Sequence, residues 1–294
     1  MAPRLAVALL AALALAACGG DGDGEPAAEQ TAPTSVAAAD GGADDSGPLH
    51  AHGLGPAPGG GLYVATHTGL FRVAGGELER VGDTVQDLMG FTVADDGTLL
   101  ASGHPDPEEA AREGLPPHLG LIRSADGGET WETVSLAGEA DFHALRAYGE
   151  RLYGFDASNA RLLASGDGGE TWEERAQPGP VIDLVADAAR PDRLLAVTPE
   201  GLFRSTDGGR SWQPLARAVG LLARPDGGPV YLVDAEGGLH VSRDGERWRR
   251  VGETGEPPAA LAALGPRELV FAGHDGDVLR STDGGATWSP LASF

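Results

Sequence analysis

Histidine is the residue type in this sequence whose positions point most directly to chemistry. The chain has eight histidines, and imidazole nitrogens bind zinc and copper or form hydrogen bonds with organic ligands. For a metal ion we expect His52, His67, His104 and His143 as ligands, with the Met89 thioether shifting the preference towards copper. Either a metal or an organic molecule in a metal-free pocket would be bound by the following histidines: His50, His52, His67, His104, His143 and His274.

Three aspartates lie close in sequence to these candidates or at matching positions. Asp87 precedes Met89 by two residues, and Asp141 precedes His143 by two. Asp183 lies at the matching position of the fourth repeat unit. Paired carboxyl groups around a pocket are sufficient for glycoside hydrolysis, with one as acid and the other as base or nucleophile. A hydrolase that uses Asp87, Asp141 or Asp183 is therefore an alternative to a binding protein.

An eight-residue motif organises the elements that must position these side chains. SADGGETW begins at Ser124, and related copies begin at Ser165, Ser205, Ser242 and Ser281, about 40 residues apart. The aspartate can bond backbone N–H groups within a turn in which the glycines take positive φ, and the tryptophan can pack between neighbouring units. We expect a structural role for the aspartate of each copy: Asp126, Asp167, Asp207, Asp244 and Asp283.

This motif is the Asp-box, or BNR repeat, and the chain resembles the Asp-box β-propellers. They include sialidases, sortilin-type receptors and photosystem assembly factors. The segments HAHGLG, ATHTGLF, MGF, SGHPDP, LGLIRSADGGETW and DFHAL are similar to an exported bacterial family often labelled glycosyl hydrolase. The resemblance implies an all-β propeller of four-stranded antiparallel blades over residues 49–294, but a shared fold does not establish chemistry. The five boxes and one degenerate unit, each in about 41 residues, predict six blades, and the alternative is a seventh blade built from the segment before residue 49.

Two units depart from the repeat. Unit one, about 49–83, keeps the strand and the Gly75-Gly76 turn of the box but lacks its Ser, Asp and Trp. Unit two carries an insertion at 102–119, in which Asp106 suits a helix N-cap, Pro107 the first turn and Gly114 the end. We expect a short helix there that acts as a lid.

The alignment of the units sorts the histidines by face. In such propellers the innermost strand of each blade begins opposite the boxes, and the loop between the second and third strands returns to that top face. Seven of the eight histidines align there, His118 included, whereas His240 falls in a third strand. The top face around the central channel is therefore the predicted site.

Sialidase activity is not expected. Sialidases need an arginine cluster and a tyrosine nucleophile supported by a glutamate. Here Arg72, Arg123, Arg204 and Arg280 recur at one repeat position, which favours a structural role, and no tyrosine has an obvious glutamate partner. A third alternative is a scaffold that binds a basic protein partner through its acidic surface.

The first 48 residues predict export. Leu5 to Ala17 is apolar and too short to span a bilayer, and Leu15-Ala16-Ala17-Cys18 resembles a bacterial lipobox in which Cys18 is lipidated. Residues 19–48 are rich in Gly, Ala, Pro and acidic residues and predict a disordered tether. We expect a lipid-anchored protein on the outer face of the cytoplasmic membrane, in the periplasm or at the cell surface. The net charge of −23 argues against nucleic acid as a partner, and the single cysteine allows no internal disulfide.

Overall fold

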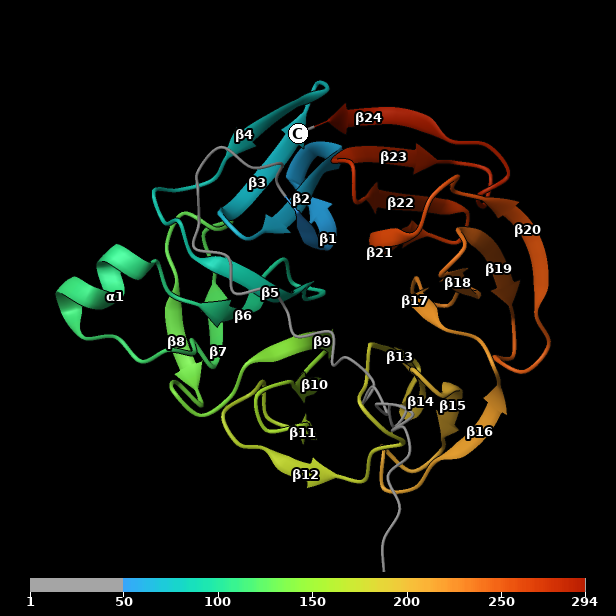
Figure 1. The fold of residues 1–294 in the computed structure, drawn as a ribbon, viewed down its shortest axis with the longest axis horizontal. Helices are drawn as coiled ribbons and strands as arrows, with labels where there is room; N and C mark the ends of the chain where they lie inside the picture. Colours follow the sequence, from blue (N-terminus) through green and yellow to red (C-terminus); the bar gives the residue numbers. More distant parts are fainter. Residues whose placement is uncertain (1–49, 294) are drawn as a thin grey trace, which may run out of the picture. The chain divides into compact units, whose positions relative to one another are not determined.

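The computed structural model describes residues 50–293, which form six four-stranded antiparallel sheets arranged in a ring (Figure 1). This confirms the predicted six-bladed β-propeller. The signal peptide, the lipidation at Cys18 and the tether lie outside the described residues. Within residues 50–293, no helix combines the length and apolar character needed to cross a membrane.

The first three blades contain the candidate site. Blade one comprises β1 (Ala51–Ala57), β2 (Gly61–Thr66), β3 (Gly69–Ala74) and β4 (Glu77–Arg80), with the 3-10 turn η1 (Pro58–Gly60) after β1. Blade two comprises β5 (Asp87–Val93), β6 (Leu99–His104), β7 (Leu121–Ser124) and β8 (Glu132–Ser135). Blade three comprises β9 (Phe142–Tyr148), β10 (Arg151–Asp156), β11 (Arg161–Ser165) and β12 (Glu173–Arg175).

The other three blades complete the ring. Blade four comprises β13 (Asp183–Asp187), β14 (Arg190–Thr198), β15 (Gly201–Ser205) and β16 (Gln213–Ala216). Blade five comprises β17 (Gly220–Ala223), β18 (Val230–Asp234), β19 (Gly238–Ser242) and β20 (Arg249–Glu253). Blade six comprises β21 (Pro258–Gly265), β22 (Glu268–Gly273), β23 (Asp277–Ser281) and β24 (Ser289–Ser293).

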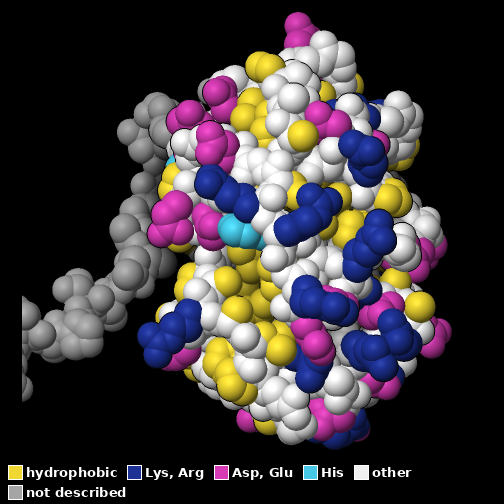
Figure 2. Space-filling model, turned by 90° about the vertical axis from the view of Figure 1, so that its right-hand side faces the viewer, with side chains coloured by type: hydrophobic (Ala, Val, Ile, Leu, Met, Phe, Trp, Pro, Cys, Tyr) yellow, Lys and Arg dark blue, Asp and Glu magenta, His cyan; other side chains and the backbone are white. Residues whose placement is uncertain are grey.

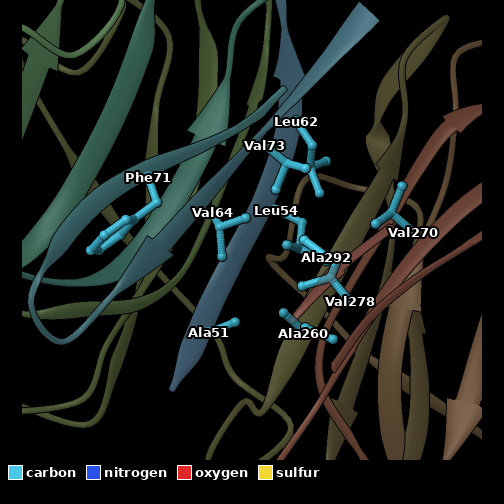
Figure 3. Packing of buried hydrophobic residues seen from close by; sticks show 11 residues of the cluster. Ala51, Leu54, Leu62, Val64, Phe71, Val73, Ala260, Val270, Val278 and Ala292 are labelled. Carbon is cyan, nitrogen blue, oxygen red and sulfur yellow. The ribbon is translucent and has the colours of Figure 1, made fainter. Parts of the chain in front are cut away.

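Buried hydrophobic clusters between neighbouring blades hold the ring together. Five of them include the box tryptophan of one blade, and these are Trp131, Trp172, Trp212, Trp248 and Trp288. The sixth, between blades six and one, is built mainly from aliphatic residues together with Phe71, because the degenerate box of blade one has no tryptophan. There Leu54 and Val64 share one cluster with Val270 and Val278 (Figure 3). Leu78 is partly buried and packs against this cluster. Each blade is a contiguous segment, so side-chain packing and not a shared strand closes the ring.

The Asp-box turns are held by hydrogen bonds that recur from blade to blade. In blade two, Ser124 Oγ accepts from the Gly128 N–H at 2.8 Å and donates to Asp126 Oδ1 at 2.7 Å. Asp126 also accepts from the backbone N–H and the hydroxyl of Thr130, at 3.0 and 2.6 Å. Both carboxylate oxygens are therefore used within the turn.

These bonds predict how the propeller responds to acid. Hydrogen bonds lower the pKa of Asp126, Asp167 and Asp207 from 3.8 to about 2. The strongest contribution comes from the hydroxyl of Thr130, Thr171 and Ser211, respectively. A depressed carboxyl pKa contributes stability that is present above the unfolded value and is lost as pH falls through the folded value. We therefore expect the melting temperature to hold down to about pH 4 and to fall between pH 3.8 and about 2.

Circular dichroism melts across this pH range test the expectation. A variant that combines Asp167→Asn with Asp207→Asn should lose part of the pH dependence in that window. An acid transition identical to that of the wild type would show that the boxes do not cause it.

The insertion in blade two forms the predicted helix, α1 (Pro107–Glu113). Asp106 caps it by accepting from the Glu109 N–H at 2.7 Å, and Gly114 ends it in the left-handed conformation at φ 69°. The predicted lid is wrong, because α1 lies outside the ring of blades and not over the channel (Figure 1). None of its residues is buried.

The outer surface is charged and mixed. On the face shown in Figure 2, arginine side chains alternate with aspartate and glutamate and with small hydrophobic areas. The repeated arginines belong to this pattern, since Arg123 pairs with Glu132 at 2.5 Å and Arg280 with Glu268 at 2.5 Å. Among residues 50–293, the large hydrophobic side chains that are exposed are Leu115 and Ile182.

Candidate functional site

A chain of histidines and aspartates runs across the top of blades six, one, two and three. The imidazole of His274 lies 4.9 Å, ring centre to ring centre, from that of His50, which lies 5.2 Å from that of His52. Beyond His52 follow His67 and Asp87, then the residues of blades two and three. The side chains that the repeat alignment assigned to one face are thus neighbours in space.

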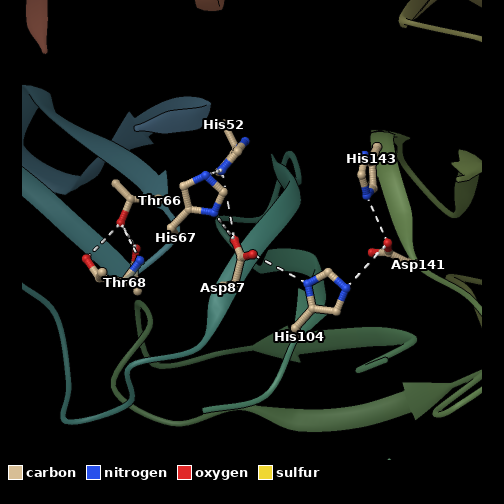
Figure 4. Close-up of polar contacts among 9 residues, drawn as sticks. His52, Thr66, His67, Thr68, Asp87, His104, Asp141 and His143 are labelled. Atoms are coloured by element: carbon tan, nitrogen blue, oxygen red, sulfur yellow. Dashed lines mark hydrogen bonds and ion pairs between the residues drawn. The ribbon is translucent and has the colours of Figure 1, made fainter. Parts of the chain in front are cut away.

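The first metal-compatible group consists of His52, His67 and Asp87, each of which offers a ligand atom within 4.8 Å of the other two (Figure 4). His52 Nε2 lies 3.0 Å from His67 Nε2 and 3.9 Å from Asp87 Oδ1. His67 Nδ1 lies 3.1 Å from Asp87 Oδ1. The three residues come from β1, from the turn between β2 and β3, and from the start of β5.

The turn that carries His67 is fixed by a buried threonine. Thr66 Oγ1 accepts from the Thr68 N–H at 3.1 Å and donates to the Gly69 carbonyl at 2.9 Å (Figure 4). A hydroxyl bonded on both sides of a tight turn holds the backbone in one conformation. The His67 imidazole is therefore presented towards blade two.

Burial and neighbouring charges set the protonation of this group. Burial, and secondarily His67, lowers the pKa of His52 to about 3, so its imidazole is neutral near pH 7. The hydrogen bond with Asp87 outweighs burial and raises the pKa of His67 above 6.5. Burial tends to raise the pKa of Asp87, but hydrogen bonds from His104 and His67 hold it well below its usual range. Asp87 is therefore a carboxylate at any physiological pH.

A second group combines His104, His118 and Asp141, again with one ligand atom of each within 4.8 Å of the others. His104 Nδ1 lies 3.4 Å from Asp87 Oδ2, and His104 Nε2 lies 3.6 Å from Asp141 Oδ2 (Figure 4). Gly103 permits this approach, because a Cβ there would lie 2.0 Å from the Asp87 carbonyl oxygen. His104 thus stands between two carboxylates.

The remaining candidates have different surroundings. His143 Nε2 lies 2.8 Å from Asp141 Oδ2, next to the second group. Met89 lines the same cavity as His52 and His143. His118 was not among the predicted ligands, although its alignment with the top face was a usable signal. The alignment could not predict the path of the insertion. This path places His118 beside His104, and the two ring centres are 5.5 Å apart.

The central cavity, of about 650 Å³, extends from His52, Met89 and His143 into the channel. Asp183 lies in its wall, and both of its carboxylate oxygens accept hydrogen bonds. It accepts from Arg146 at 2.6 Å, from the Leu184 N–H at 2.7 Å and from the Leu222 N–H at 2.8 Å. The Asp183 side chain therefore links blades three, four and five, which indicates a structural role.

Comparisons with known proteins agree with the repeats. The model of the BNR/Asp-box repeat matches residues 203–214 and 279–290. A curated relative, the dispase autolysis-inducing protein of Streptomyces mobaraensis, is 36% identical over 112 residues. That match covers 35% of this chain and 29% of the relative, so the chain spans under a third of its length.

Solved structures share the architecture at low sequence identity. A GH74 enzyme from Niastella koreensis superposes with a TM-score of 0.62 at 15% identity, over 83% of this chain and 45% of that one. Virginiamycin B lyase from Staphylococcus aureus gives 0.54 at 14% identity, over 84% of this chain and 85% of the lyase. Such identities show a common fold and leave the chemistry open. The protein is thus a six-bladed β-propeller built from BNR/Asp-box repeats.

Proposed function

We propose that the protein binds a transition metal, zinc or copper, on its top face through His52, His67 and Asp87. The observation that supports this most directly is the convergence of two imidazoles and a carboxylate from three separate elements. Zinc–ligand bonds of about 2.0–2.2 Å in tetrahedral geometry separate ligand atoms by roughly 3.3 Å. His52 Nε2 lies 3.0 Å from His67 Nε2 and 3.9 Å from Asp87 Oδ1, which is close to that separation. One ligand atom of each residue lies within 4.8 Å of the other two.

The protonation states suit a metal better than a metal-free pocket. Metal ligands must be deprotonated, and His52 and Asp87 already are, since their pKa values lie well below neutrality. Burial, followed by the neighbouring His274 and His67, also lowers the pKa of His50. A bound cation would use the lone pairs of these neutral imidazoles.

Three protein ligands, of which His52 lines the central cavity, leave a coordination position open. Catalytic zinc sites have this pattern, whereas structural sites are closed by four protein ligands. His52 lines the cavity directly, and Met89 lies along the same wall. A small molecule that enters the cavity would therefore meet the metal.

Glycoside hydrolysis is the second candidate, favoured by the two carboxylates on either side of His104. It needs one carboxyl that is protonated near neutral pH. Asp87 does not fit that role because its pKa is depressed. Burial raises the pKa of Asp183, but its carboxylate is held by Arg146 and two backbone donors. Asp141 remains as the candidate acid, and a screen of chromogenic glycosides against an Asp141→Asn variant would detect the activity.

The place of action follows from the N-terminal sequence. We infer that Cys18 is lipidated and that residues 19–48 tether the propeller outside the cytoplasm.

Binding of a protein partner is the third candidate function. The mixed charges of the face in Figure 2 favour a polar contact over an apolar one.

Metal content tests the proposal. Protein stripped with a chelator and dialysed against zinc or copper should retain at least one ion per chain by plasma mass spectrometry. A His52→Ala/His67→Ala double variant should retain at least one ion fewer. His240→Ala is the matched control, because His240 pairs with Asp234 in blade five and should leave the metal content unchanged. A wild-type protein that retains no metal would refute the proposal and make the site a pocket for an organic ligand.

A further inference from the structure

We propose that the top face holds a second metal ion, bound by His104, His118 and Asp141 and coupled to the first through Asp87. The inference rests on the proposed function, since it extends the same site to a two-metal centre. The second group meets the same distance condition as the first, and its residues come from β6, from the insertion after α1 and from the segment before β9.

His104 lies between two carboxylates, an arrangement that favours a cation at this position. A neutral imidazole has one N–H and one lone pair. His104 faces the Asp87 carboxylate with Nδ1 at 3.4 Å and the Asp141 carboxylate with Nε2 at 3.6 Å. In either neutral tautomer a nitrogen lone pair therefore faces a carboxylate oxygen. Either a second proton on the ring or a metal ion beside it would remove this repulsion.

Two buried atoms favour the metal over the proton. Asp141 Oδ1 and His118 Nδ1 are both buried, and neither has a hydrogen-bond partner among the described residues. The Asp141 side chain is only 6% exposed, and leaving a buried polar atom unpaired is energetically unfavourable. A proton on His104 leaves both atoms unpaired, whereas a metal ion in the group accepts lone pairs from both.

The tautomer of His118 agrees with this assignment. His118 Nε2 lies 3.4 Å from Ser158 Oγ, so an Nε2–H can donate to that hydroxyl. Nδ1 then carries the lone pair, and Nδ1 is the buried atom that has no partner. A hydrogen bond on the distal nitrogen is the usual means by which proteins orient a histidine ligand.

Asp87 couples the two groups. Its Oδ1 faces His67 of the first group at 3.1 Å, and its Oδ2 faces His104 of the second at 3.4 Å. When His104 binds through Nε2, its Nδ1–H donates to Asp87, which orients the ring and raises its basicity. Asp87 is thus a ligand of the first ion and a positioning residue for the second.

Zinc titration of the full chain, followed by calorimetry and by native mass spectrometry, tests the inference. We expect two ions per chain in the wild type and in the His240→Ala control. His118→Ala should bind one ion, with the affinity of the first site within about threefold. His52→Ala/His67→Ala should also bind one ion, at the second site. Asp87→Asn should weaken both sites, the second by about 10–100-fold.

The outcomes separate this inference from the proposed function. One ion in both the wild type and His118→Ala would overturn the second site and leave the first intact. One ion in the wild type and none in His118→Ala would show a single site shared by both groups, which also overturns the inference. No ion in the wild type would refute both. His118 lies in a loop and is not fully buried, so circular dichroism should show His118→Ala to be folded.

Discussion

Replacing His52 with alanine should lower the affinity for zinc or copper by more than about 100-fold, or about 2.8 kcal/mol. Changes to residues that only support a ligand typically cost about 10–100-fold, so the loss of a ligand itself should cost more. His52 lies 3.0 Å from His67 and is the most deeply buried imidazole of the first group. Competition with a chelator of known affinity would measure the change.

The same titration at several pH values checks the mechanism. Because the pKa of His67 is raised above 6.5, protons compete with the metal there, and affinity should fall as pH drops through that raised value. His52, with a pKa of about 3, should add no competition until much lower pH. An affinity that is independent of pH between 5 and 8, or that is unchanged in His52→Ala, would rule out this ligand set.

Phe271→Ala should lower the free energy of unfolding by about 3–5 kcal/mol without changing metal binding. Phe271 is fully buried in β22, within the cluster between blades five and six, and its ring centre lies 6.0 Å from that of Trp288. The substitution leaves a cavity in packing that closes the ring, and it lies in a blade that contributes no ligand to either metal-compatible group.

Urea unfolding followed by tryptophan fluorescence would measure this loss, and zinc binding would be measured at a temperature at which the variant stays folded. Glu77→Ala is a useful control, because Glu77 is exposed at the start of β4 and should change stability by less than about 0.5 kcal/mol. A loss below about 1 kcal/mol in Phe271→Ala would mean that the blade interface relaxes around the cavity.

The repeat explains why so much of the fold could be read from the sequence. Each box carries its own turn chemistry in Ser, Asp and Gly, and its tryptophan supplies the packing against the preceding blade. Even blade one follows the pattern, since Leu78 and the aliphatic residues of the cluster between blades six and one replace a tryptophan. Local signals of this kind need no information from distant residues, and the N-cap of α1 was predictable for the same reason.

The sequence by itself determined the six blades, the turns and the face on which seven histidines gather, because each depends on residues within one repeat. Tertiary structure alone decided three further features. It places His118 beside His104, and it places α1 outside the ring. It also lets the Asp183 carboxylate accept hydrogen bonds from Arg146 and from two backbone N–H groups of blades four and five. These features depend on distances between blades. Such distances are set by the packing of about forty-residue units against one another, and no spacing along the chain encodes them.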